Sequence, residues 1–334
     1  MGSDYNEEIK HISYDDILSY TGNCSADNKI GNFQFGEVYR GKMGEKEVTV
    51  KIWRNNRSRY ISFIRDNATR FNDELILQTL GGVTSHCRVA KMIEYCDDED
   101  ENRLAVVYNL NPLDILQNLI HEDNLTWLQR VKIAYQLADL LKFLHTAPLA
   151  EGKRPYMVRN LNPAHIMIGQ DYSPILYEFS MFSGGIQPDR NHLGHLTTPG
   201  YSGYTDPPFS WVGDLIDKNG VYEYADARLD GVRSLDEWAA EEYGKRVAEC
   251  GKGNVSLVHP SFEHDQDFEL ADGPKITNVV MDCLIDDPSE RPSIDRVIDL
   301  LDGLSVVQRN PDTFGIGTNR GHKPSHDEAS EVEI

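Results

Sequence analysis

The chain has 334 residues, with 33 Lys or Arg against 54 Asp or Glu, which gives a formal net charge of −21. Its length favours two domains or one large two-lobed domain, and its 40% of hydrophobic residues suffice for a sizeable core. The acidic balance argues against nucleic acid as the main partner, because binding to phosphates needs clustered Lys and Arg. The five cysteines are dispersed and lack paired metal-ligand spacing, which is typical of reduced thiols in the cytosol.

No apolar run approaches the roughly 18 residues that a membrane span needs, and the first residues lack a signal-peptide pattern. Gly2 follows Met1, as N-acylation requires, but Asn6 stands where Ser or Thr is preferred. We therefore expect a cytoplasmic protein with at most peripheral association with the plasma membrane, and acylation of Gly2 stays open.

The first part of the chain carries mostly strand patterns. A short amphipathic stretch at 12–18 is followed by strand patterns at 36–39 and 47–53, the second with alternating apolar residues. A helix is predicted over about 59–80, where apolar residues recur at helical spacing before Gly81 and Gly82. A second strand pair is predicted at 89–95 and 104–110, and we interpret the acidic run between them as a solvated hairpin loop.

Helix patterns dominate the later part of the chain. A helix is predicted over 127–145, where Thr126 and Gln129 form a capping box. Its expected buried stripe consists of Leu128, Val131, Leu137, Leu141 and Leu144. Another helix is predicted over 293–303, and the polar, patternless residues after about 310 predict a disordered tail.

This order of elements predicts an α+β architecture with two lobes. We expect an N-terminal extension over 1–29, an N-lobe with an antiparallel sheet and one helix over 30–108, a mainly helical C-lobe over 109–307, and a tail over 308–334.

A Gly-rich turn at 30–36 precedes a strand that carries Lys51, an arrangement that can cradle phosphates. Five further motifs follow in order: Phe71-Asn72-Asp73-Glu74, Arg159-Asn160-Leu161-Asn162-Pro163, Tyr177-Glu178-Phe179-Ser180, Gly203-Tyr204-Thr205-Asp206-Pro207 and Glu290-Arg291-Pro292-Ser293. Over roughly 280 residues this ordered set resembles the protein-kinase signatures, which implies a two-lobed protein-kinase fold.

Within that fold, the chain resembles the plant receptor-like cytoplasmic kinases at 14–18, at Val107-Tyr108 and at 144–147. It is most similar to an inactive group, the pseudokinases that act as adaptors or decoys for a coiled-coil NLR immune receptor. Phe179-Ser180, where most kinases have Phe-Gly, supports this placement. The resemblance implies a role in plant innate immunity. The partners it implies are proteins: an NLR receptor, receptor-like cytoplasmic kinases and a pathogen effector.

The resemblance also places the catalytic machinery on residues that do not suit it. Asn160 stands where the catalytic Asp is expected, and an amide cannot accept the proton of the substrate hydroxyl. Asn162 replaces a Lys, His165 replaces a metal-binding Asn, and Glu178 replaces a metal-binding Asp. Phe33 takes the place of the middle glycine of the Gly-rich loop. Since these groups act together, we predict a pseudokinase with no catalytic or metal-binding residues.

Part of a nucleotide pocket remains in the sequence. By resemblance, it comprises Ile30, Gly31, Gly36, Val38, Lys51, Glu74 and Tyr108. An ion pair between Lys51 and Glu74 either supports ATP binding or only holds the helix in place. No cofactor is required under our prediction, and ATP binding stays open. Two alternatives remain: a weak Ser/Thr kinase that uses Glu178 for the metal, and a scaffold that binds ATP without transferring phosphate.

Two departures from the kinase pattern concern the fold. Arg291 lacks the usual Glu partner, so we predict another acceptor, such as Asp206. The segment 213–245 lacks the apolar run of the family's central helix, which leaves its structure open. The segment 180–199 corresponds to the activation loop, and we expect a partner to order it.

Overall fold

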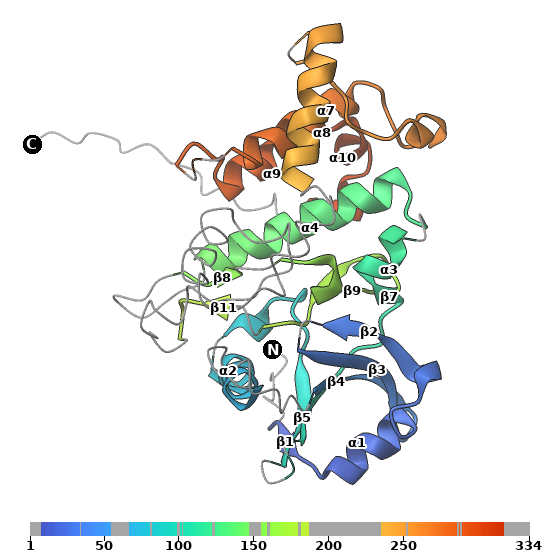
Figure 1. The fold of residues 1–334 in the computed structure, drawn as a ribbon, viewed down its shortest axis with the longest axis vertical. Coiled ribbons are helices and arrows are strands. Elements are labelled where there is room, and N and C mark those ends of the chain that lie inside the picture. Colours follow the sequence, from blue (N-terminus) through green and yellow to red (C-terminus); the bar gives the residue numbers. More distant parts are fainter. Residues whose placement is uncertain are drawn as a thin grey trace, which may run out of the picture.

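The computed structural model describes residues 8–33, 35–54, 67–80, 82–98, 101, 103–121, 124–146, 155–158, 161–179, 182–186, 235–251, 253–285, 287 and 289–316. These residues form a sheet-based N-lobe and a mainly helical C-lobe, which confirms the predicted α+β, two-lobed architecture (Figure 1). Asn160, Asp206 and most of the segment 180–234 lie outside the described residues, so the predictions made there stay predictions.

The N-lobe is built on a six-stranded sheet of order β1-β5-β6-β4-β3-β2. Its strands are β1 Lys10–His11, β2 Lys29–Phe33, β3 Gly36–Met43, β4 Lys46–Trp53, β5 Met92–Asp98 and β6 Arg103–Tyr108. All neighbours are antiparallel except β1 and β5. All four predicted strands are present, but β5 lies about three residues later than the predicted 89–95. Strand β3 extends past the predicted 36–39 because its pairing with β4 continues to the tight turn after Met43.

Two helices cover the two faces of this sheet, α1 Tyr14–Thr21 and α2 Asn67–Leu80 (Figure 1). Val48 and Val50 of β4 face α1, where they form a core cluster with the fully buried Ile17. Lys51, one residue on, faces the α2 side, as the alternation of a strand requires. The stretch 8–29 is therefore part of the N-lobe rather than an extension preceding it.

The C-lobe contains short strands and most of the helices. Its strands are β7 Asp114–Ile115, β8 Met157–Val158, β9 Ile166–Ile168, β10 Pro174–Leu176 and β11 Phe182–Ser183. Its helices are α3 Leu116–His121, α4 Trp127–Thr146, α7 Leu235–Cys250, α8 Asp272–Cys283, α9 Ile294–Asp302, α10 Ser305–Arg309 and α11 Pro311–Phe314. The 3-10 turns are η3 Pro163–His165 and η5 Pro260–His264 in the C-lobe, and η1 Ala26–Asn28 and η2 Val83–Ser85 in the N-lobe. Helix α9 confirms the predicted 293–303, with Ser293 as its N-cap.

The long helix α4 crosses the middle of the molecule (Figure 1). Its capping box is confirmed, because Gln129 N donates to Thr126 Oγ1 at 3.3 Å and Thr126 N donates to Gln129 Oε1 at 2.9 Å. The predicted buried stripe is only partly right: Val131 and Leu144 are buried, whereas the other members, Leu128, Leu137 and Leu141, are half-buried. The reason is that α4 packs on two sides, against the core cluster that includes the short C-lobe strands β9 and β10 and against the C-terminal helices, so a single apolar stripe does not describe it.

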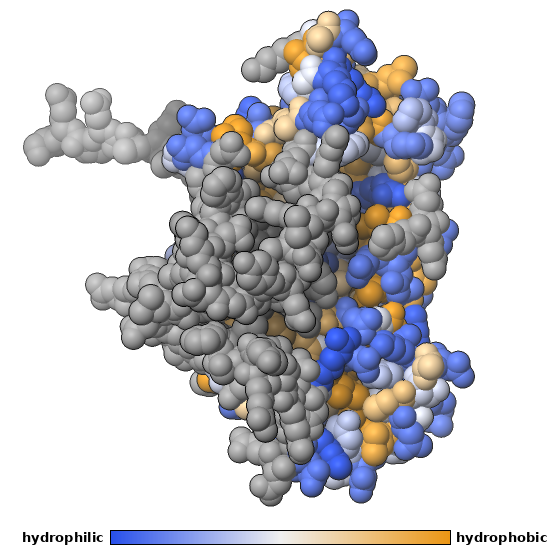
Figure 2. All heavy atoms as spheres, viewed as in Figure 1, coloured by the Kyte–Doolittle hydropathy of each residue, from blue (hydrophilic) through white to orange (hydrophobic). Residues whose placement is uncertain are grey.

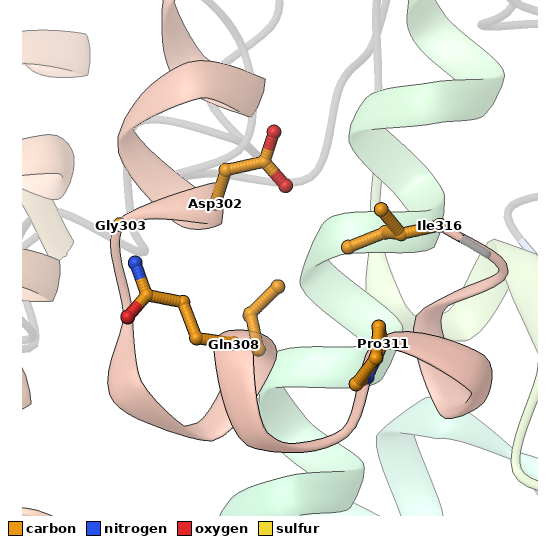
Figure 3. Close-up of a pocket in the computed structure, with 6 residues that line it drawn as sticks. Asp302, Gly303, Gln308, Pro311 and Ile316 are labelled. Atoms are coloured by element: carbon orange, nitrogen blue, oxygen red, sulfur yellow. The ribbon is translucent and has the colours of Figure 1, made fainter. Parts of the chain in front are cut away.

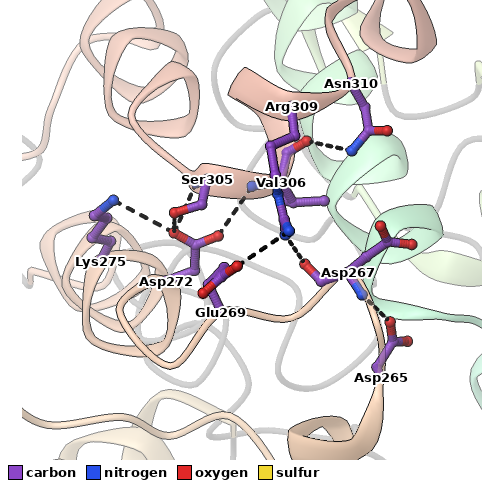
Figure 4. A network of polar contacts seen from close by, with 9 residues as sticks. All are labelled: Asp265, Asp267, Glu269, Asp272, Lys275, Ser305, Val306, Arg309 and Asn310. Carbon is purple, nitrogen blue, oxygen red and sulfur yellow. Dashed lines mark hydrogen bonds and ion pairs between the residues drawn. The ribbon is translucent and has the colours of Figure 1, made fainter.

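Residues 305–316 are folded, although we expected the tail to start at 308. Asp272 at the start of α8 is fully buried, and it accepts a hydrogen bond of 2.8 Å from Ser305 N, which caps α10 (Figure 4). Beyond this, the buried Phe314 packs edge-on against Tyr135 of α4, with ring centroids 5.5 Å apart. The buried Asp272 carboxylate, the buried Val306 and Val307, and the Phe314 ring thus hold a segment that has no apolar period. Residues 317–334 lie outside the described part.

Arg291 is half-buried and donates from Nε to the Ile285 carbonyl at 2.6 Å. It therefore has an acceptor within the C-lobe, as we predicted. Helix α7 occupies the last residues of the segment 213–245, whose structure the sequence left open.

On the face drawn in Figure 2, hydrophilic residues are the most common, with hydrophobic residues scattered among them, as the net charge of −21 leads one to expect. Across the described ranges, no helix combines the length and the apolar character that a membrane crossing needs.

Candidate functional site

Four buried polar side chains meet between the N-lobe sheet, α2 and the segment after β10. Lys51 comes from β4, Glu74 from α2, Tyr108 from the end of β6, and Glu178 from the chain just after β10. The Lys51 ammonium lies 2.7 Å from a Glu74 oxygen and 2.6 Å from a Glu178 oxygen. The pair between Lys51 and Glu74 is thus formed, and Glu178 joins it. We call these four residues the Lys51 cluster.

The Lys51 ammonium is fully engaged within the protein. An ammonium has three N–H donors, and three acceptors surround this one: Glu74, Glu178 and, at 3.5 Å, the Tyr177 carbonyl. The rings of Phe33 and Trp53 lie over it as well, with their centroids 4.7 and 4.6 Å from Nζ. Since the side chain is 0% exposed, a phosphate can reach Lys51 only by displacing one of these groups.

The electrostatics of the Lys51 cluster follow from its burial. Burial raises the pKa of Glu74 to about 7, and the nearby Glu178 carboxylate raises this pKa further, while Lys51 acts in the opposite direction. The Tyr108 hydroxyl donates to Glu74 and lies 3.1 Å from the Tyr177 carbonyl. Burial also holds the pKa of Tyr108 well above its usual value, so this hydroxyl stays a donor. One ammonium therefore serves two carboxylates.

The described residues of the Gly-rich loop, 30–33, 35 and 36, do not form an open cradle. Phe33, at the end of β2, is buried with its ring on Lys51 and edge-on to Trp53. A Cβ on Gly36 would lie 2.6 Å from the Phe33 ring, and a Cβ on Gly31 would lie 2.6 Å from Ile115 Cδ1. The two glycines that we placed in a nucleotide pocket thus lie against side chains of the protein itself. The other pocket residues, Ile30 and Val38, are buried in the same core cluster as Tyr108.

The catalytic-loop residues are used for local structure. Asn162 Oδ1 accepts from Ala164 N at 2.8 Å and caps the turn η3, and both Asn162 and His165 are buried. The His165 carbonyl accepts from Tyr177 N at 3.3 Å, which ties this turn to the Lys51 cluster. Among the described residues, no three His, Cys, Asp or Glu side chains are grouped so that they could hold a metal ion.

Several residues that shape this region were missed by sequence reasoning. Thr49 Oγ1 donates to the Leu110 carbonyl at 2.9 Å, and Arg40 donates to the carbonyls of Pro112 and Leu113 at 2.8 and 2.6 Å. These bonds tie the segment that connects the lobes to strands β3 and β4. Their partners are 61 to 73 residues apart in sequence, so no local pattern could have indicated them.

A cavity of about 530 Å³ lies away from the Lys51 cluster, among the C-terminal helices α9, α10 and α11 (Figure 3). Its lining residues are Asp302, Gly303, Val307, Gln308, Pro311 and Ile316. Asp302 is the acidic residue among them, and it accepts from the Tyr135 hydroxyl at 3.0 Å. This lining contains none of the residues that the sequence assigned to a kinase site.

Comparison with known proteins agrees with this architecture. The sequence model of the family "Protein tyrosine and serine/threonine kinase" matches residues 24–171. The chain is 25% identical to the probable serine/threonine-protein kinase PBL17 of Arabidopsis thaliana over 311 residues, which cover 89% of this chain and 67% of the relative. It is also 25% identical to PBL12 and PBL6 of the same plant. These matches cover 90% and 98% of this chain, and 71% and 74% of the relatives. The chain is thus similar to these plant kinases over most of its length, and its residues 24–171 match the kinase family model.

A kinase domain generally uses ATP together with metal ions. The residues described here do not fit that complex. Two carboxylates contact Lys51, and the Phe33 ring lies over its ammonium. Because Glu178 pairs with the lysine, its carboxylate does not face a metal site. His165 stands where an oxygen ligand for Mg²⁺ is expected, and Mg²⁺ prefers oxygen.

Proposed function

We propose that this kinase-domain protein is a catalytically inactive adaptor or decoy in plant innate immunity. In this role it binds an NLR receptor and senses a pathogen-modified kinase or an effector. The observation that carries the inactive part is the buried Lys51 ammonium, which donates to Glu74 and to the Tyr177 carbonyl and forms an ion pair with Glu178. The amide at Asn160 adds to this, because a positioned catalytic base typically contributes about 10²–10⁴ in rate.

The adaptor part rests on the sequence resemblance and on homology to plant kinases. A kinase fold without phosphoryl transfer still offers two lobes in a set arrangement, and here side chains of β3 and β4 hold the connecting segment. The net charge of −21 suits a partner with a basic surface. We assign the recognition of the modified kinase or effector to the activation-loop segment 180–199, and place the protein in the cytoplasm.

The adaptor proposal is tested by capture of the tagged protein from plant cytosol, with the partners identified and quantified by mass spectrometry. We expect an NLR receptor at a stoichiometric level. The triple variant Lys51→Met/Glu74→Gln/Glu178→Gln is the matched control, because it changes only buried residues and should capture the receptor equally well. Recovery of receptor kinases or phosphorylated clients without any NLR would refute the adaptor role.

A weak serine/threonine kinase is the second candidate. The relatives, each described as a probable serine/threonine-protein kinase, favour it, and so does the retained carboxylate of Glu178. This candidate requires Glu178 to leave Lys51 and hold a metal ion. A scaffold that binds ATP without transfer requires only that nucleotide reach Lys51. Its signature is a rise in thermal stability with ATP that is lost when Lys51 is replaced.

A further inference from the structure

We propose that the protein fills its own nucleotide cleft, with Phe33 and Ile115 in the space that a nucleotide needs and with Phe33 as the residue that excludes ATP. The inference deepens the inactive part of the proposed function and rests on it. Under this inference, side chains of the protein, and not a bound nucleotide, fill the space between the two lobes.

The first observation is the position of Phe33. Its ring is buried and stands over the Lys51 ammonium, 4.7 Å away, and it continues into an edge-on stack with Trp53 and then Phe71 of α2. In kinases the lysine of this strand holds the nucleotide phosphates. A ring at this distance leaves no room for a phosphate between loop and lysine, and the absence of a side chain at Gly36 is what lets the ring fold under the loop.

The second observation is Ile115 of β7, whose side chain packs against the Gly-rich strand β2. Its side chain is buried and lies directly beneath Gly31 of β2, so closely that a Cβ there would be 2.6 Å from it. Next to this contact, Asn118 of α3 donates to the Ile30 carbonyl at 3.1 Å. The C-lobe thus contacts the Gly-rich strand directly, both through an apolar side chain and through a hydrogen bond.

The third observation is that the hydrophobic core is continuous between the lobes. A single cluster of buried residues runs from Phe33 and Val38 in the N-lobe, through Ile115 and Met167, to Leu140 of α4. Apolar contact on this scale is the main source of stability between packed elements. No ligand is needed to complete it.

The fourth observation concerns charge. The Lys51 cluster sets two carboxylates against one ammonium, so it offers no net positive charge to a triphosphate. Steric and charge effects therefore both oppose a nucleotide, and the steric effect acts through Phe33.

The test is binding of ATP with Mg²⁺ to the purified full chain, measured by calorimetry. We expect no binding to the wild type up to several millimolar ATP. For Phe33→Gly we expect a Kd at least about tenfold below that limit. Phe35→Gly is the matched control in the same loop, because the Phe35 ring packs on Arg70 at 3.7 Å and not on Lys51. This control should bind no better than the wild type. Adding Lys51→Met to Phe33→Gly should abolish the gained binding.

A second measurement keeps the inference testable if Phe33→Gly does not fold. Hydrogen exchange of β2, β3 and 109–115 in the wild type should be the same with and without ATP. Protection by ATP, or wild-type affinity equal to that of Phe33→Gly, would overturn the inference, and so would a folded Phe33→Gly that binds no ATP. A wild type that binds ATP but transfers no phosphate would refute this inference alone and leave the proposed function standing.

Discussion

Lys51→Met should lower the free energy of unfolding by about 3–5 kcal/mol at neutral pH, because it leaves two buried carboxylates without their cation. Glu74 and Glu178 are both buried and both contact this ammonium, at 2.7 and 2.6 Å. Methionine is close to lysine in volume, so lost volume should contribute little. The measurement is urea-induced unfolding followed by circular dichroism, with the slope compared between variants.

Two controls isolate the charge. Lys46→Met changes an exposed residue of the same strand and should alter the free energy of unfolding by no more than about 0.5 kcal/mol. The triple variant Lys51→Met/Glu74→Gln/Glu178→Gln contains no charge in the cluster and should recover most of the lost stability, since a neutral replacement of a buried ion pair is often tolerated. A single variant as stable as the wild type would show that Lys51 does not hold these carboxylates together.

The stability of the wild type should fall as the pH rises from about 5.5 to 8, and Glu74 should be the cause. Its pKa is about 7 in the folded chain against an ordinary value of 4.5, so between these values the folded state holds a proton that the unfolded state has lost. The contribution of the Glu74 carboxyl to the free energy of unfolding is therefore fully present below pH 4.5 and is lost as the pH rises through 7. From the size of the shift, the full loss is about 3 kcal/mol, of which about 2 falls between pH 5.5 and 8.

Glu74→Gln provides the comparison, because an amide imitates the protonated carboxyl and can still accept from Tyr108. The charged and polar groups that face Glu74 are Lys51, Glu178 and Tyr108, and all of them remain in this variant. Its urea-unfolding profile should be flatter with pH, and the variant should exceed the wild type in stability at pH 8. Parallel profiles for the two proteins would show that Glu74 does not take up a proton in this range.

The parts of the fold that were predictable are those with a local pattern. The alternation in 47–53 predicted β4 and placed Lys51 on the face opposite Val48 and Val50. The spacing of Thr126 and Gln129 predicted the start of α4. In both cases the residues that determine the structure are a few positions apart, so their spacing can be read directly.

The rest depended on contacts between distant residues. Ile115 meets Gly31 across 84 positions, and Asp272 caps a helix that starts 33 residues later. Sequence reasoning did anticipate that Phe33 crowds the phosphate position. It did not anticipate that Glu178 would reach Lys51, because the longer side chain could equally have held a metal ion. Only the three-dimensional arrangement shows that this carboxylate and the lysine form an ion pair.

The most direct test of the central claim, a kinase fold that does not transfer phosphate, is incorporation of radiolabelled γ-phosphate into the protein and into a basic substrate protein. The wild type should incorporate no more than the triple variant Lys51→Met/Glu74→Gln/Glu178→Gln, in Mg²⁺ or Mn²⁺. Greater incorporation by the wild type, with loss of the excess in Glu178→Gln, would contradict the claim and establish a weak kinase that uses Glu178.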